Sequence, residues 1–182
     1  MKKNWEGDIY GGYTELEFYT ANSDLHDLQF VLNKNNEDSL RIYDWAFLNN
    51  NKLFIVYLPG PKRKVQAYIG GYDLQTKELY HSSVKFPWSL SGYYLAYSAN
   101  RNEVYAIGSN GIFYIIDPDT YSIKDNINLT TTGEQSPIVI TPDDNFAFIA
   151  YPNSNAIFVI DLNNRKVIKR ISVNEPYNMI IP

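Results

Sequence analysis

Four short apolar segments separated by turn residues make up the C-terminal part of the chain, from residue 136 onward. They cover residues 137–140, 146–151, 156–162 and 166–173. Short runs of this kind, bounded by Asn, Asp and Pro, predict β-strands joined by tight turns. After residue 176 a further segment, 177–182, resembles the first of the four. The chain therefore ends in a four-stranded unit and the beginning of another.

Earlier parts of the chain align with this unit. An Asn or Asp closes the third segment each time, and the residues in that position are Asn33, Asp73, Asp117 and Asp161. The three aspartates recur every ~44 residues, and a four-stranded unit at a period of ~40–45 residues is typical of a propeller blade. We therefore predict an all-β fold, a β-propeller of about four four-stranded antiparallel blades in one domain, 1–182.

The first proposed blade lacks one of its four strands, and one predicted strand at the end of the chain has no blade of its own. The blades cover residues 14–41 with 177–182, then 42–87, 92–130 and 137–173. The first lacks its opening strand, and an unpaired apolar strand needs a partner, so we expect residues 177–182 to complete it and close the ring. Two alternatives are a homodimer formed by strand exchange and a piece of a longer propeller, for example one of seven blades.

The strands within a blade differ in pattern. Residues 113–116 and 158–160 are continuous apolar runs, as expected of strands buried on both faces. Residues 124–128 and 166–171 carry more charge, which discourages pairing with another sheet at an outer edge. The closing Asn and Asp residues are expected to accept hydrogen bonds from backbone N–H groups of the next turn rather than to act in catalysis. No segment has a sustained helical period, so helix content should be close to nil.

The run from Ile140 to Ile181 resembles the YVTN-type β-propeller repeat. That repeat has a Ser/Thr-Pro-Asp-Gly turn, a Tyr-Val-rich strand, an Asn-Ser turn, a strand ending in Val-Ile-Asp and a Pro-Tyr start to the next unit. Here Asp144 stands where the family usually has glycine, and Phe146–Ala150 replaces the Tyr-Val strand. The resemblance is strongest over 136–182, looser over 16–135, and implies a fold rather than an activity.

Composition limits the classes of partner. The net charge of −4 gives no overall attraction to nucleic acid, and no apolar stretch approaches the ~20 residues that span a bilayer. The absence of cysteine excludes disulfides and thiolate zinc sites. The N-terminus lacks the apolar run of a signal peptide. As the sequence stands we expect a soluble, cytoplasmic protein, or an extracytoplasmic one if a leader was removed.

Irregular connections at one end of the blades are the candidate binding face. The loop at 58–64 carries three cations between stiffening prolines, and Trp88 lies between a proline and a serine. The candidate binding residues are Lys62, Arg63, Lys64, Trp88, Tyr93, Tyr94, Glu134 and Tyr177. Each of these features also has a purely structural interpretation. The loop can be a solvated hairpin tip, Trp88 can fill the gap between adjacent blades, and Tyr93 and Tyr94 can be core residues.

Residues for catalysis are scarce. The two histidines, His26 and His81, occupy non-equivalent places in the repeat, and no phosphate loop or calcium loop is present. We therefore expect no catalytic residues, metal or cofactor, and predict a non-enzymatic binding or scaffold module for a protein or glycan partner. The alternatives are a propeller enzyme of the lactonase or quinoprotein type and a structural piece of a surface-layer or phage assembly.

Overall fold

The computed structural model describes residues 17–19, 28–30, 40–49, 51–59, 66–76, 78–87, 93–177 and 179. This part of the chain contains fourteen strands and one 3-10 turn, Pro152–Ser154. Within it, no helix is long and apolar enough to cross a membrane. Within the described residues all strand pairs are antiparallel, and each sheet is built from strands that follow one another in sequence.

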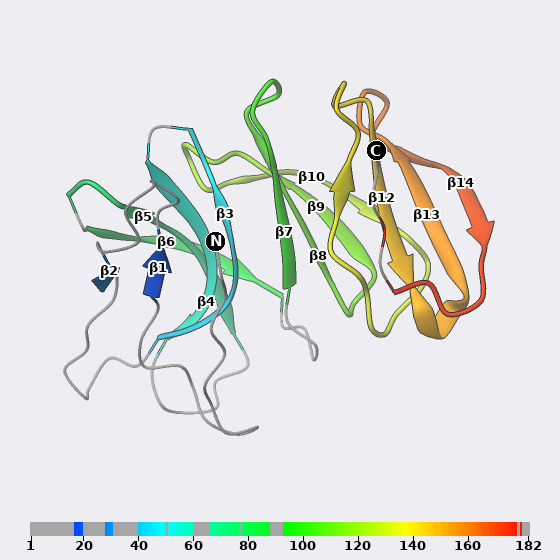
Figure 1. Ribbon diagram of the computed structural model, residues 1–182, viewed down its shortest axis with the longest axis horizontal. Helices are drawn as coiled ribbons and strands as arrows, with labels where there is room; N and C mark the ends of the chain where they lie inside the picture. Colours follow the sequence, from blue (N-terminus) through cyan, green and yellow to red (C-terminus); the bar gives the residue numbers. More distant parts are fainter. Residues whose placement is uncertain are drawn as a thin grey trace.

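Three four-stranded sheets and one two-stranded sheet form the described structure (Figure 1). The two-stranded sheet pairs β1 (Glu17–Tyr19) with β2 (Leu28–Phe30). The other strands are β3 (Leu40–Phe47), β4 (Lys52–Pro59), β5 (Ala67–Asp73), β6 (Leu79–Phe86), β7 (Tyr93–Ser98), β8 (Glu103–Gly108), β9 (Ile112–Ile116), β10 (Ile123–Asn128), β11 (Val139–Ile140), β12 (Phe146–Tyr151), β13 (Ala156–Asp161) and β14 (Lys166–Ser172).

The sheets follow one another along the longest axis of the molecule, from β1–β2 at one end to β11–β14 at the other (Figure 1). The first strands of successive four-stranded sheets, β3, β7 and β11, are neighbours in space. Sheets arranged in this way share their apolar faces with the sheets on either side. The prediction of an all-β fold made of antiparallel four-stranded sheets is confirmed.

Two apolar cores fill the spaces between the three large sheets. The core between β3–β6 and β7–β10 contains Phe54, Val56, Ala67, Ile69, Val104, Ala106, Tyr114 and Ile116. The core between β7–β10 and β11–β14 contains Tyr105, Ile107, Phe113, Ile115, Ala147, Ile149, Phe158 and Ile160. Because β8 and β9 contribute to both cores, their side chains are buried on both faces, as their continuous apolar sequence predicts.

Strand boundaries agree closely with the sequence pattern in the last sheet. The segment predicted at 146–151 is β12, and those at 156–162 and 166–173 each end one residue earlier than expected. The segment at 137–140 contains only the two-residue strand β11. Of the expected closing strand, 177–182, the structure describes Tyr177 and Met179, neither of which is in a strand. The other four residues lie outside the described part, so ring closure remains a prediction.

The aspartates that close the third strands bind the following turn as predicted. Asp73 Oδ1 accepts hydrogen bonds from the backbone N–H groups of Gln75 (2.8 Å) and Thr76 (3.0 Å). Asp117 and Asp161 make the equivalent pairs of bonds, each between 2.9 and 3.0 Å. These side chains satisfy backbone donors that the sheet cannot. Asn33 lies outside the described residues.

Candidate binding face and the polar seam

The sheets have two chemically different ends. At one end, which we call the turn end, lie the tight connections 99–102, 117–122, 141–145 and 162–165. At the other, the loop end, lie the connections 109–111, 129–138 and 152–155. The turn end is uppermost in Figure 1 and the loop end lowermost. Of the candidate binding residues predicted from the sequence, Glu134 and Tyr177 are exposed at the loop end.

At the loop end, one crossing segment joins two sheets. The segment 129–134 leaves β10 and bonds back to the β8–β9 turn, with Leu129 N–H donating to the Gly111 carbonyl (2.9 Å) and Gly133 N–H to the Ser109 carbonyl (3.0 Å). The hydroxyls of Thr131 and Ser154 are 2.6 Å apart, which links the same segment to the next sheet. The backbone of the crossing segment is therefore held on both sides.

Gly111 makes this crossing possible. Its φ of +72° is a left-handed conformation, and a Cβ there would come within 1.6 Å of the Thr131 carbonyl oxygen. Only glycine allows two backbones to approach so closely in that conformation. The backbone of residues 129–134 therefore packs directly against the β8–β9 turn.

Several side chains project outward at this end. Thr130, Thr132, Glu134 and Asn153 are exposed, and Tyr177 is 56% exposed. The tail that carries Tyr177 is fixed beside them, because Val173 N–H donates to the Asn155 carbonyl (3.0 Å) and Glu175 N–H to Asn155 Oδ1 (2.9 Å). Hydroxyl, amide, carboxylate and phenol groups are therefore presented on a backbone that is held in place.

The predicted binding residues fall into three groups. Lys62, Arg63, Lys64 and Trp88 lie outside the described residues. Glu134 and Tyr177 are exposed at the loop end, in connections that both contact the 152–155 turn region. Tyr94 is half-buried on β7 and packs against the core shared with β11–β14.

Tyr93 is a core residue. Only 2% of it is exposed, and its ring lies against Phe86, at 4.7 Å between centroids, and Tyr43, at 6.2 Å. Its hydroxyl donates a hydrogen bond to the Pro87 carbonyl. Burial, with the nearby phenols of Tyr114 and Tyr43, raises the pKa of Tyr93. The side chain fills the seam between two sheets, which was the structural alternative for this residue.

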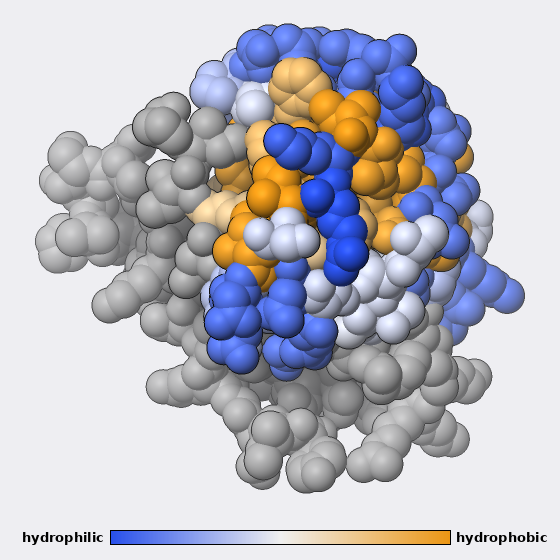
Figure 2. All heavy atoms as spheres, turned by 90° about the vertical axis from the view of Figure 1, so that its right-hand side faces the viewer, coloured by the Kyte–Doolittle hydropathy of each residue, from blue (hydrophilic) through white to orange (hydrophobic). Residues whose placement is uncertain are grey.

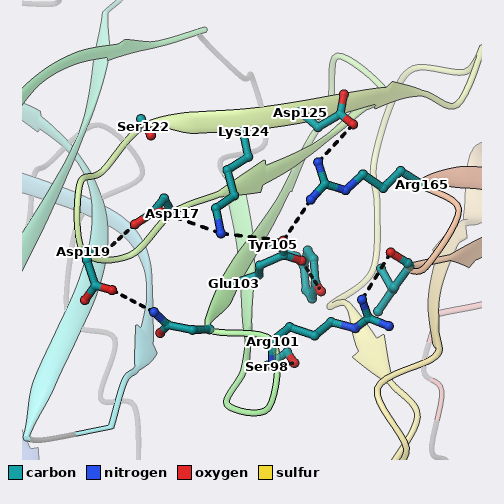
Figure 3. A network of polar contacts seen from close by, with 12 residues as sticks. Ser98, Arg101, Glu103, Tyr105, Asp117, Asp119, Ser122, Lys124, Asp125 and Arg165 are labelled. Carbon is teal, nitrogen blue, oxygen red and sulfur yellow. Dashed lines mark hydrogen bonds and ion pairs between the residues drawn. The ribbon is translucent and has the colours of Figure 1, made fainter.

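A charged network that the sequence did not indicate lies at the turn end, centred on Glu103 (Figure 3). The Glu103 side chain is 8% exposed and lies 3.2 Å from Arg165 and 3.8 Å from Lys124. The Tyr105 hydroxyl donates to its other oxygen at 3.0 Å. A carboxylate so far removed from water requires partners of this kind.

Both cations extend the network to further carboxylates. Lys124 also lies 3.6 Å from Asp117, and Arg165 lies 3.4 Å from Asp125. Because Arg165 belongs to the last sheet and its acidic partners to the preceding one, the pairs join β7–β10 to β11–β14. The signal for this contact in the sequence is the long, charged side chain of Arg165 at the fourth position after the closing Asp161.

Arg101 makes a second link across the same seam. From the β7–β8 turn it donates to the Asp144 carbonyl (2.7 Å), to the Leu162 carbonyl (3.4 Å) and to Asn163 Oδ1. Asn100 Nδ2 donates to Asp144 Oδ2 at 2.6 Å. Two arginines therefore reach across the seam in opposite directions, one from each sheet.

The closing aspartates have lowered pKa values. At Asp73 the backbone N–H groups of Thr76 and Gln75 lower the pKa, and at Asp161 the Asn164 side chain and backbone do so. At Asp117 burial opposes ionisation, but the N–H groups of Thr120 and Asp119, with Lys124, outweigh it and the pKa is lowered. These carboxylates are held in the charged, accepting form that the turn needs.

The turn end therefore holds Glu103, Asp117 and Asp125 paired with Lys124 and Arg165, and the loop end holds outward-facing hydrogen-bonding groups such as Thr132 and Glu134. Among the described residues no three His, Asp or Glu side chains converge in a way that could hold a metal ion. The arrangement at the turn end is suited to fastening sheets together, and that at the loop end to contacting another molecule.

Comparison with known proteins gives a likeness in structure. No protein-family model and no curated protein matches the sequence. Among solved structures, hydrazine synthase from Kuenenia stuttgartiensis is similar, with a TM-score of 0.56 and 17% sequence identity over 74% of this chain. The match covers 37% of the hydrazine synthase chain, so this chain spans well under half of its length. At that identity the likeness concerns the fold alone.

Proposed function

We propose that the chain is a non-enzymatic binding module of β-propeller type, related to YVTN repeats, which recognises a protein or glycan partner at the loop end. The observation that carries this proposal is the crossing segment 129–134. Its backbone is bonded to the β8–β9 turn and linked through Thr131 to Ser154, while Thr132 and Glu134 face outward. A surface that is already ordered loses less conformational entropy on binding.

The chemistry of the exposed groups favours a polar ligand with an apolar face. Tyr177 offers a ring on which a sugar or a side chain can stack, and Thr132, Glu134 and Asn153 offer donors and acceptors beside it. The sheets behind the surface act as the rigid frame. Under this proposal, the ion pairs at the turn end maintain the frame and do not contact the partner.

The proposal is tested with an array of neutral and acidic oligosaccharides and a panel of synthetic peptides, followed by titration calorimetry on the strongest probe. We expect Glu134→Gln and Tyr177→Ala each to weaken binding about tenfold or more, as central contacts do. Glu78→Gln, at an exposed position of the turn end, is the matched control and should leave the dissociation constant unchanged. Binding that is insensitive to both loop-end changes, or lost in Glu78→Gln, would refute the proposed face.

A further inference from the structure

The outer strand of the last sheet, β14, is paired along only one of its two edges. The sheet order is β11-β12-β13-β14, and no described strand lies on the far side of β14. In Figure 1 this strand is the outermost at one end of the molecule. Figure 2 faces the same end and shows hydrophilic residues along its upper and right-hand rim, around a central group of hydrophobic ones. Within the described part of the chain, one edge of β14 is therefore unpaired.

The register of β14 shows which of its backbone groups point outward. Val173 N–H donates to the Asn155 carbonyl (3.0 Å), and bonded and non-bonded residue pairs alternate along an antiparallel ladder. Arg170 and Ser172 therefore stand in non-bonded pairs, with their N–H and C=O groups directed away from β13. The regular stretch covers residues 169–173 and is preceded by a β-bulge. This stretch presents the alternating donors and acceptors to which another strand can bond.

β14 carries three cations and no carboxylate. Lys166, Lys169 and Arg170 are all exposed, and only Lys166 lies opposite an acid, Asp161, in the register. Arg170 donates to the Ser154 carbonyl (3.0 Å), a neutral group, so its charge is not compensated there. The equivalent strand β10 has one cation and one carboxylate, both of them in ion pairs. None of the described ion pairs includes a residue of β14.

This charge selects which strand can pair with β14. A second copy of β14 would bring cations beside cations, which opposes pairing of the chain with itself at this edge. A strand with carboxylates opposite Lys169 and Arg170 instead gains a cross-strand attraction. Ile171 and Val173 follow on the same edge, and Val173 is 38% exposed. Apolar residues therefore suit the positions of the partner that lie opposite these two.

We propose that the free edge of β14 binds an extended acidic segment of another protein, which joins the four-stranded sheet as an additional strand. The backbone groups of Arg170 and Ser172 hold the segment, and the side chains of Lys169 and Arg170 select its carboxylates. Strand addition of this kind takes its affinity from main-chain hydrogen bonds and its specificity from side chains. The site runs along the side of the last sheet and is distinct from the crossing segment 129–134 of the proposed function.

The test is the fluorescence anisotropy of labelled synthetic peptides titrated with the full chain. The probe contains Val-Thr-Val-Glu-Glu, which in antiparallel orientation places its glutamates opposite Arg170 and Lys169. It should bind at least about tenfold more tightly than the same peptide with lysines in place of the glutamates. Lys169→Glu should weaken binding about tenfold. Lys85→Glu, at an exposed position of the outer strand β6, makes the same change of charge and should leave the dissociation constant unchanged.

N-methylated peptides separate strand addition from attraction of charge alone, and they do not depend on how a protein variant folds. Methylation of the threonine and the first glutamate, opposite Ser172 and Arg170, removes N–H groups that face β14 and should weaken binding at least about tenfold. Methylation of the two valines, whose N–H groups face away, should change it by less than about twofold. Equal affinities of the two methylated peptides would show attraction of charge only and overturn the proposal. Binding that persists in Lys169→Glu, or no binding of the acidic probe, would overturn it as well.

Discussion

The hydroxyl of Tyr121 occupies the space that a side chain on Gly71 would need. A Cβ at position 71 would lie 2.0 Å from that hydroxyl and 2.9 Å from the ring carbon that bears it. The ring is held there by stacking on Phe54, with centroids 5.8 Å apart. A side chain at position 71 would therefore displace the Tyr121 ring from the seam between the first two large sheets.

Gly71→Ala should destabilise the protein by about 1–3 kcal/mol, the usual cost of overpacking. In the Tyr121→Ala background the same change should cost much less, because the clashing ring is gone. Urea unfolding of the four proteins in this cycle measures the coupling. Gly70→Ala serves as the control, since its Cβ would clash with the Tyr80 carbonyl at 2.6 Å whichever residue stands at 121. Equal costs of Gly71→Ala in both backgrounds would contradict the contact.

Glu103→Gln should destabilise the protein by about 1–3 kcal/mol, because Lys124 and Arg165 lose the carboxylate they share. The interaction of Glu103 with Arg165 alone should be smaller, about 0.5–1 kcal/mol, since the arginine side chain is 38% exposed and partly screened by solvent. A double-mutant cycle with Arg165→Gln, run at low and high salt, separates the two quantities. A coupling energy of zero at low salt would show that the pair does not stabilise the seam.

Acid should weaken the fold through the closing aspartates. The folded-state pKa of Asp117 lies below the value of 3.8 expected for an unfolded chain. A lowered folded pKa stabilises the protein above that unfolded value, and the contribution disappears as the pH falls through 3.8 toward the folded pKa. The free energy of unfolding should therefore fall steeply below about pH 4.

Asp117→Asn is the matched variant for this pH dependence. The amide retains an oxygen that can accept the N–H groups of Asp119 and Thr120, but it does not titrate. Its stability curve should be flatter in acid than that of the wild-type chain when both are followed by urea unfolding between pH 2.5 and 7. Parallel curves would mean that the charge of Asp117 contributes nothing to the turn.

Gly111→Ala should displace the crossing segment of the loop end. The cost should be roughly 2–5 kcal/mol, because a left-handed conformation and a backbone clash with Thr131 are imposed together. Hydrogen exchange at the amides of Leu129 and Gly133 should accelerate, since both bond to the β8–β9 turn. Thr132→Ala, at an exposed position of the same segment, is the control and should leave the Leu129 amide protected. Unchanged exchange in Gly111→Ala would contradict this role.

The repeat could be predicted from the sequence because its signals are local. Each closing aspartate binds N–H groups two and three residues ahead, so a fixed spacing is enough to find Asp73, Asp117 and Asp161. The continuous apolar run of β9 likewise indicated a strand between two layers, and the structure shows it so. These features are set within one strand and its turn, and do not depend on which sheets pack against each other.

The contacts between sheets could not be predicted in the same way. Alternation assigns Tyr93 to a face but does not show that Phe86 and Tyr43 close around it. Arg165 and Tyr121 occupy the same place in the repeat and yet bind different partners, because the residue opposite changes from one sheet to the next. Identifying them requires knowledge of which strands become neighbours.

Both seams have an apolar core, and they differ in the contacts that are added to it. Tyr121 against Phe54 and Gly71 is an apolar contact, which salting-out ions strengthen. Arg165 between Glu103 and Asp125 is an ionic contact, which dissolved salt weakens. Rising ionic strength would therefore weaken the ion pairs that join the last sheet to the one before it, whereas the contact of Tyr121 with Phe54 carries no charge for salt to screen.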